Sequence, residues 1–484
     1  MSKAVAPDWP HQALEYKIGR DKRSRALIWP MRSGKSKACI DKACFQFERG
    51  TIEGVIVVAP NGVHLNWCVN EIPRWTWPEV GPHRAFAWET PKRGLVEQDA
   101  AFRQMCAHKG LKFFCINMEA LKHLDCRRAV KEFIVSCHKN FMLIVSEAHH
   151  FGRAGSKRTH FARSLAYHAN YVQTETGTPI LTGPLRAFSQ FELLAPGALG
   201  FRTFGEFKKN YAEMEPSRPG GRKYEKVARY INLDELTAKI AKWSSLVLRA
   251  DLHDMPPLIR TERPVLMTNR CRLAYLEMVS RHMAEIGDDL IAVKDAGPRM
   301  IKLQQILHGY IKDPLTDRIL EIDPDAAIYD AVIDEIVGTL PGKALVWCRY
   351  HEDIRRLMLK LPKNLKFLPY HGHMTARARE INRMQFLTDP TIGGIVGTPD
   401  TGGEGLDFSA ADAVIYMSIP PNARMIAQSE ERATVKGGKS VSVVRIRHYG
   451  TVDDRMWEIV DGNMSLADTI TGTGLRDLLL KTDC

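Results

Sequence analysis

The stretch "FMLIVSEAHHFGRAGSKR" occupies residues 141–158 and joins a run of apolar residues to a polar, charged segment. A short, nearly continuous apolar run of this kind is typical of a strand that is buried on both faces of a parallel sheet. Ligands of open α/β sheets bind beyond the carboxyl ends of the strands. The residues that end this run, Ser146 and Glu147, are therefore candidates for a functional site at the edge of a sheet.

Similar apolar runs recur in two separate groups along the chain. The first group comprises residues 26–31, 54–60, 112–117, 141–146 and 171–177, and the second comprises residues 343–349, 365–371, 393–399, 413–419 and 440–446. Longer amphipathic stretches alternate with these runs, and such alternation predicts parallel sheets covered by helices. We therefore expect an α/β fold with two parallel-sheet lobes.

The composition changes between the two groups. Residues 186–245 and 269–312 read as helical, whereas "DLHDMPPLIRTERP" (251–264) is proline-rich and reads as a linker. We expect a first lobe at 1–190, its helical insertion at 191–250, a linker at 251–265, a helical insertion of the second lobe at 266–324, the second lobe at 325–465 and a C-terminal tail at 466–484.

The overall composition narrows the class of protein. The chain has 484 residues, of which 44% are hydrophobic and 26% are charged, as in soluble globular proteins with two or three domains. It contains no apolar run long enough for a bilayer and no signal-peptide core, so we expect a cytoplasmic protein without membrane contacts. Ten cysteines without a Cys-x-x-Cys pair argue against zinc and a disulfide framework. A net charge of +12 favours a polyanionic partner, nucleic acid first.

The segment "MRSGKSK" (31–37) follows the first predicted strand and opens a predicted helix. In a P-loop, backbone N–H groups at a helix N-terminus cradle phosphates, a lysine neutralises the terminal phosphates and the next hydroxyl binds magnesium. Lys35 and Ser36 fit the last two roles, and the cradle comprises Arg32, Ser33 and Gly34. ATP and Mg²⁺ are thus the expected cofactors, with Glu147 placed to orient the attacking water or hold the metal.

Further segments follow one another in a characteristic order. They are "WPHQ" with Gln12, residues 57–75, 144–158, 176–180, 195–211, 301–309, 370–380, 397–422 and 428–438. In this order they resemble the core of superfamily-two helicases, most specifically Swi/Snf-type DNA translocases. The resemblance extends from about residue 8 to residue 460.

The resemblance implies two RecA-like lobes that hydrolyse ATP between them, with Glu147 positioning the water. Gln12 would read the adenine, and Arg432 would reach the γ-phosphate with Gln428 beside it. Gly403, Glu404 and Gly405 fall in the block that senses nucleotide and DNA.

The resemblance also implies a partner and a setting. The partner would be double-stranded or forked DNA, bound with little sequence specificity by a monomer, although composition alone leaves RNA open. A chain with few additional modules suggests a bacterial or bacteriophage protein of recombination, repair or replication, in a bacterial cell or infected host.

Three positions depart from the family pattern. Trp29 stands where the full P-loop pattern has glycine, Ser146 replaces an aspartate that holds hydrated magnesium, and Val435 replaces a second arginine, with Lys436 adjacent. Because a neutral hydroxyl is a poorer partner for a dication, Ser146 is a weak metal ligand, and Ser146→Asp is expected to increase magnesium-dependent turnover.

Two other functions stay open beside the motor. One is a degenerate helicase core that binds DNA with weak or no ATP hydrolysis, as the three departures would allow. The other is a small P-loop kinase or transferase, against which the second lobe and the arginine block at residues 428–438 argue.

Overall fold

A computed structural model describes residues 8–471 of the chain, apart from short internal segments. These segments are residues 90–95, 152–154, 178–182, 218–223, 249–250, 253–257, 282, 287–288, 293–295, 400, 402–406, 420–422 and 435–437. The chain divides into two compact units. The first is built mainly from Met1–Glu213 and Val227–Leu252, and the second from Met214–Lys226 and His253–Met464.

The first unit contains a seven-stranded sheet in which every neighbouring pair is parallel. Its order is β3-β4-β2-β5-β6-β1-β9. The strands are β1 (Ser24–Ile28), β2 (Gly54–Ala59), β3 (Arg84–Trp88), β4 (Lys112–Asn117), β5 (Phe141–Ser146), β6 (Tyr171–Thr176) and β9 (Ser244–Leu246). All six residues of β2, β4 and β5 are buried, as their continuous apolar sequences predict.

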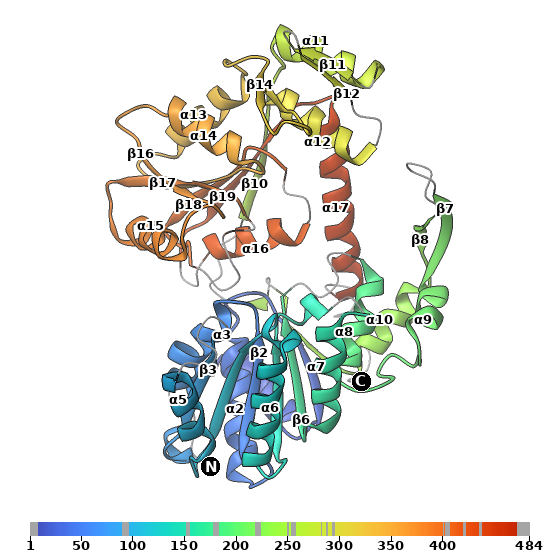
Figure 1. Cartoon of the computed structure of the whole chain (residues 1–484), viewed down its shortest axis with the longest axis vertical. Helices are drawn as coiled ribbons and strands as arrows, with labels where there is room; N and C mark the ends of the chain where they lie inside the picture. Colours follow the sequence, from blue (N-terminus) through green and yellow to red (C-terminus); the bar gives the residue numbers. More distant parts are fainter. Residues whose placement is uncertain are drawn as a thin grey trace. The chain divides into compact units, whose positions relative to one another are not determined.

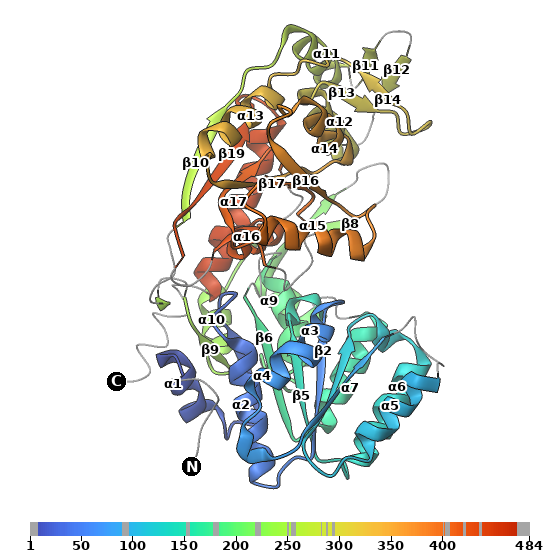
Figure 2. The same ribbon diagram turned by 90° about the vertical axis from the view of Figure 1, so that its left-hand side faces the viewer.

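Helices cover both faces of this sheet, as Figure 2 shows. On one side lie α1 (Pro10–Gly19), α2 (Lys35–Glu48), α3 (Val63–Asn66) and α4 (Ile72–Trp75), and on the other α5 (Val96–Cys106), α6 (Leu124–Ser136) and α7 (Lys157–His168). Because parallel crossovers are right-handed, the direction in which the chain moves along the sheet decides which face each helix covers. After β6 the chain continues through α8 (Ala187–Glu192), α9 (Phe204–Tyr211) and α10 (Leu233–Ala241).

The second unit contains a six-stranded parallel sheet of order β10-β19-β18-β15-β17-β16. Its strands are β10 (Leu258–Pro264), β15 (Lys343–Trp347), β16 (Lys366–Tyr370), β17 (Ile392–Gly397), β18 (Ala411–Tyr416) and β19 (Val441–Arg447). Helices α13 (Ile328–Thr339) and α14 (His351–Lys360) lie on one face, and α15 (Ala376–Thr388) and α16 (Ala423–Ala433) on the other (Figure 1). Helix α17 (Val452–Thr471) follows β19. The predicted α/β fold with two RecA-like parallel-sheet lobes is confirmed, and all ten predicted strands are present.

Two segments differ from their predicted secondary structure. The proposed linker, 251–265, contains β10, which pairs with β19 along its whole length. Its sequence "LIRTERP" lacks the apolar run of a buried strand, because β10 is an edge strand whose side chains are mostly exposed. Arg447 binds Glu262 across this pair at 3.0 Å, so charge rather than apolar packing accompanies the pairing.

The regions predicted as helical insertions are mixed rather than all-helical. Between α9 and α10 lies the two-stranded sheet of β7 (Ala212–Ser217) and β8 (Tyr224–Tyr230). The later region contains α11 (Asn269–Ser280), β11 (Met283–Ile286), β12 (Asp289–Ala292), α12 (Ala296–Leu307), β13 (Tyr310–Lys312) and β14 (Ile319–Glu321). Two-stranded sheets in these regions contribute few buried side chains, so their sequences lack the apolar runs by which the main strands are recognised.

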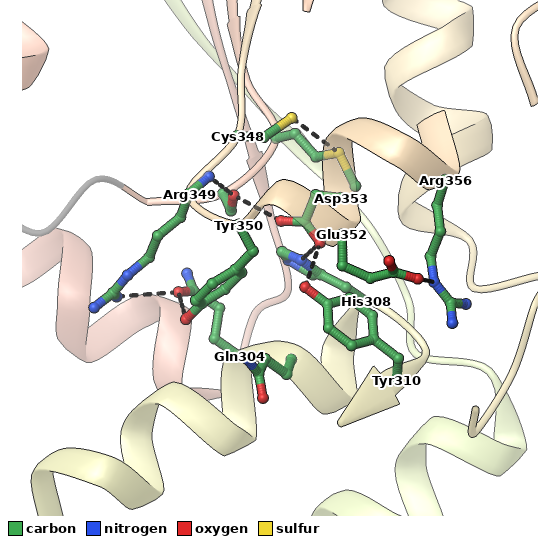
Figure 3. A network of polar contacts seen from close by, with 12 residues as sticks. Gln304, His308, Tyr310, Cys348, Arg349, Tyr350, Glu352, Asp353 and Arg356 are labelled. Carbon is green, nitrogen blue, oxygen red and sulfur yellow. Dashed lines mark hydrogen bonds and ion pairs between the residues drawn. The ribbon is translucent and has the colours of Figure 1, made fainter. Parts of the chain in front are cut away.

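A buried polar network joins this later region to the second sheet (Figure 3). The Asp353 carboxylate, on α14, is fully buried and accepts hydrogen bonds from His308 Nδ1 (2.9 Å), the Tyr310 hydroxyl (2.9 Å) and the Ser418 hydroxyl (3.2 Å). Burial lowers the pKa of His308, but the attraction of Asp353 outweighs burial and holds that pKa above its ordinary value. Three donors, two from residues 308–310 and one from Ser418, thus stabilise one buried charge.

We expect Asp353→Ala to lower the free energy of unfolding by about 3 kcal/mol or more, because removal of the carboxylate leaves its three buried hydrogen-bond donors without an acceptor. Urea unfolding followed by far-UV circular dichroism measures the effect. The matched control is Asp325→Ala, whose exposed carboxylate pairs with Lys360 at 3.0 Å and should contribute less than about 1 kcal/mol. Equal midpoints for both variants would show that the network adds no stability.

Candidate active site

The loop between β1 and α2 is closed by its own side chains. Lys35, the first residue of α2, is buried and donates from Nζ to the carbonyls of Trp29 (3.1 Å) and Pro30 (2.9 Å). Ser33 Oγ donates to the same Pro30 carbonyl at 2.7 Å. Because a buried ammonium is costly without partners, these carbonyls fix the lysine beneath the loop.

The backbone turns sharply at two positions before α2 begins. Arg32 and Gly34 have φ angles of 60° and 77°, in the left-handed region. The backbone conformation favours glycine at this position, and a Cβ atom at Gly34 would lie 2.0 Å from Gln12 Nε2, so a larger residue would have to displace the end of that side chain. The turn leaves the N–H groups of the first turn of a 14-residue helix directed at the loop.

Gln12, on α1, is held against this loop. Its Nε2 donates to the carbonyls of Ser33 and Gly34, each at 3.3 Å, and its Oε1 accepts from the Trp9 N–H at 2.9 Å. The neighbouring His11 Nε2 lies 2.8 Å from the Ser33 carbonyl. The amide predicted to read adenine is thus adjacent to the P-loop and oriented by it.

Ser146 ends β5 and meets an acid on the neighbouring strand. Ser146 pairs with Glu175 of β6 in the sheet, and Ser146 Oγ donates to Glu175 Oε1 at 2.6 Å. Each of the two residues is 3% exposed. The position at which the sequence resemblance led us to expect an aspartate therefore has a carboxylate beside it.

Glu175 also faces α2. Its Oε2 lies 3.8 Å from Sγ of Cys39, which is one turn beyond Lys35 on α2. Burial raises the pKa of the Glu175 carboxyl to about 7, against the opposing effects of the Lys35 charge and the Ser146 hydrogen bond. The acid thus lies within the electrostatic field of the P-loop lysine.

Glu147 follows directly, with a φ of 52° that is unusual for a side chain other than glycine. Its Oε2 is 3.2 Å from His149 Nδ1 and 3.5 Å from the Thr176 hydroxyl, which itself lies 2.9 Å from His149 Nδ1. Strained backbone at a strand end is common where a side chain must be aimed at a ligand. The arrangement suits a carboxylate that orients a water molecule.

The remaining predicted residues belong to the second unit. Gln428 and Arg432 lie on α16 and are buried. The Arg432 carbonyl accepts the Phe408 N–H at 3.2 Å, which anchors the end of that helix. Gly403, Glu404, Gly405, Val435 and Lys436 lie outside the described residues.

The first unit brings the P-loop residues, Ser146 and Glu147 to one edge of its sheet. Glu175 was not predicted as a site residue, although its sequence held one signal. In "YVQTETG" (171–177) an acid interrupts a strand that should be buried, and a buried acid requires a partner. The identity of that partner depends on strand pairing, which the sequence does not show.

Comparison with known proteins relates the chain to helicase-like proteins. Residues 327–436, in the second unit, match the family model of the helicase conserved C-terminal domain. TATA-binding protein-associated factor mot1 of Aspergillus fumigatus is 23% identical over 378 residues, which cover 68% of this chain and 20% of that protein. The DNA annealing helicase and endonuclease ZRANB3 of Homo sapiens is 22% identical over 433 residues, covering 87% of this chain and 36% of that protein. The chain thus spans well under half the length of these curated relatives.

A solved structure, the Sulfolobus solfataricus SWI2/SNF2 ATPase core in complex with dsDNA, aligns with 99% of this chain and 96% of that chain, at 17% identity and a TM-score of 0.42. Among the described residues, none of the helices combines the length and apolar character that crossing a bilayer requires. Of these comparisons, the family model gives the most local result, a similarity of residues 327–436 to the helicase conserved C-terminal domain.

We expect Gly34→Ala to disturb the loop at two levels. The left-handed backbone should cost about 1–2 kcal/mol of stability, and the new methyl group should displace Gln12 and weaken ATP binding. The matched control is Gly50→Ala, because Gly50 follows the other end of α2 with a φ of 69° and has open space around it. Thermal unfolding and titration with a fluorescent ATP analogue measure both effects. Unchanged ATP binding by Gly34→Ala would contradict the loop assignment.

Proposed function

We propose that this chain is an ATP-dependent DNA translocase or helicase that acts on duplex or branched DNA. The observation that carries the proposal is the convergence of Lys35 with two buried carboxylates, Glu147 and Glu175, at the carboxyl edge of the first sheet. The helicase C-terminal match of residues 327–436 supports a motor over a small P-loop kinase, which would need no such domain.

The donor set of the first unit fits ATP with a magnesium ion. Backbone N–H groups at the start of α2 and the Lys35 ammonium would bind phosphate oxygens, and the Ser36 hydroxyl and the nearby carboxylates are hard oxygen ligands suited to Mg²⁺. The bound cation would neutralise charge on the terminal phosphates. Glu147, held by His149 and Thr176, would orient the water that attacks the γ-phosphate.

Two observations support DNA as the polymer. The net charge of +12 suits a polyanion, and the human relative is named a DNA annealing helicase and endonuclease. Contacts in such a motor go mainly to phosphates, so the proposal includes little sequence preference.

Several finer expectations remain predictions. They are the γ-phosphate role of Arg432, the neighbouring role of Gln428, the monomeric state, the bacterial or bacteriophage source and the part played in recombination, repair or replication. The curated relatives reported above come from a fungus and from human, so they do not bear on the source.

We expect the parent protein to hydrolyse ATP faster when DNA is present, and Lys35→Ala to abolish hydrolysis. Loss of a charge-assisted contact removes about 1.5–3 kcal/mol of binding before any transition-state effect. Glu147→Gln should still bind ATP but turn it over roughly a hundredfold more slowly, because the carboxylate that orients the attacking water is lost. Steady-state ATPase assays with single-stranded, duplex and forked DNA measure these effects.

The same assay separates the motor from the degenerate core. A folded parent that binds DNA but never turns over ATP would favour the degenerate core. A Lys35→Ala variant as active as the parent would refute the P-loop assignment.

We expect DNA binding to weaken steeply with salt. Even two neutralised phosphates predict about a tenfold loss of affinity between about 50 mM and about 200 mM salt. Fluorescence anisotropy with labelled duplexes of two unrelated sequences measures both the salt slope and the sequence preference, and an RNA duplex provides the comparison. Affinity that is constant across this salt range would count against phosphate-dominated binding.

A further inference from the structure

We propose that Glu175 supplies, from β6, the carboxylate that holds the hydrated magnesium ion of the bound nucleotide, and that Ser146 positions it by a hydrogen bond. The inference rests on the proposed function, and it assigns a metal-holding residue at that site. In this proposal, Glu175 on the neighbouring strand supplies the negative charge that a serine at position 146 lacks.

The sheet register places the two residues side by side. Ser146 of β5 and Glu175 of β6 are direct partners in a parallel pair, and neighbouring strands are about 4.8 Å apart. A glutamate has one more methylene than an aspartate, so it can reach across this spacing toward the neighbouring strand end. The 2.6 Å hydrogen bond from Ser146 Oγ to Glu175 Oε1 shows that the carboxylate is directed toward the end of β5.

The other side of Glu175 faces the P-loop. Glu175 is also the sheet partner of Leu27 in β1, two residues before Trp29, whose carbonyl binds Lys35. Its second oxygen, Oε2, faces Cys39 of α2 at 3.8 Å. The carboxylate therefore lies between the end of β5 and the first two turns of α2, the helix that carries Ser36, the expected metal ligand.

The simplest alternative is that Glu175 is a structural acid that is satisfied by its neighbours. A carboxylate has about four acceptor sites, and among the described residues its side chain receives one hydrogen bond from Ser146 and one weak contact from a thiol. A buried carboxylate with so few donors is costly for stability alone. A nearby cation would stabilise the ionised carboxylate, as the positive charge of Lys35 does in part.

The proposal changes the expected effect of Ser146→Asp. With Glu175 only 2.6 Å from the Ser146 hydroxyl, a second carboxylate there would repel the first. The single variant should gain no magnesium affinity, whereas Ser146→Asp combined with Glu175→Gln should restore one carboxylate at the site. This exchange distinguishes a metal-holding acid from a structural one.

The test measures nucleotide binding rather than turnover. A fluorescent ATP analogue is titrated in Mg²⁺ and in EDTA against the parent, Glu175→Gln, Ser146→Asp and the double variant. Electron paramagnetic resonance of Mn²⁺ with ATP reports the metal directly. Glu192→Gln is the control, since Glu192 is a buried acid of the same unit that pairs with Arg163 and accepts the Gly197 N–H at 2.7 Å.

Glu175→Gln should weaken binding about tenfold or more in Mg²⁺ and leave binding in EDTA unchanged, as expected for loss of a partner of a bound metal. The double variant should recover to within about threefold of the parent, and Glu192→Gln should match the parent. If Glu175→Gln fails to fold, rescue by the double variant still decides the question, and a double variant without magnesium dependence overturns the proposal.

Other results separate the two levels of inference. A Glu175→Gln variant that binds Mg²⁺–ATP as the parent does would overturn the role of Glu175 while the proposed function stands. A parent that binds no ATP in either condition would overturn both.

Discussion

The parallel pairing of β5, β6 and β1 is the constraint on which the candidate site depends. In this register Ser146 lies beside Glu175, and Glu175 lies beside Leu27 just before the P-loop. Because side chains alternate between the faces of a strand, a slip of one residue in β6 would turn Glu175 to the face opposite α2. The backbone hydrogen bonds between these buried strands thus determine which side chains lie together at the carboxyl edge of the sheet.

The same constraint explains how a serine can occupy the last position of β5. A cleft that binds a cation requires a negative charge near a given point, and neighbouring strands can supply it from either side. Here the hydroxyl of Ser146 keeps a polar contact at the strand end while Glu175 contributes the charge. Lys35, held by the carbonyls of Trp29 and Pro30, limits the cost of burying that charge.

Much of this architecture could be predicted from local sequence, because buried strands such as β5 consist of nearly continuous apolar residues. The expected phosphate-binding loop could also be proposed from the sequence, since Gly34, Lys35 and Ser36 are adjacent in the chain. Strand β10 was not visible, because its exposed, charged side chains resemble those of a linker. The role of Glu175 was hidden for a different reason, since its partner Ser146 lies 29 residues away and only the sheet brings them together.

The most direct test of this account is hydrogen exchange, followed by mass spectrometry, with and without Mg²⁺ and a slowly hydrolysed ATP analogue. The account predicts joint protection of peptides that cover residues 30–37, 143–148 and 172–177, because these segments end at one edge of the first sheet. Saturating nucleotide that protects none of these peptides, or only peptides elsewhere in the chain, would contradict it.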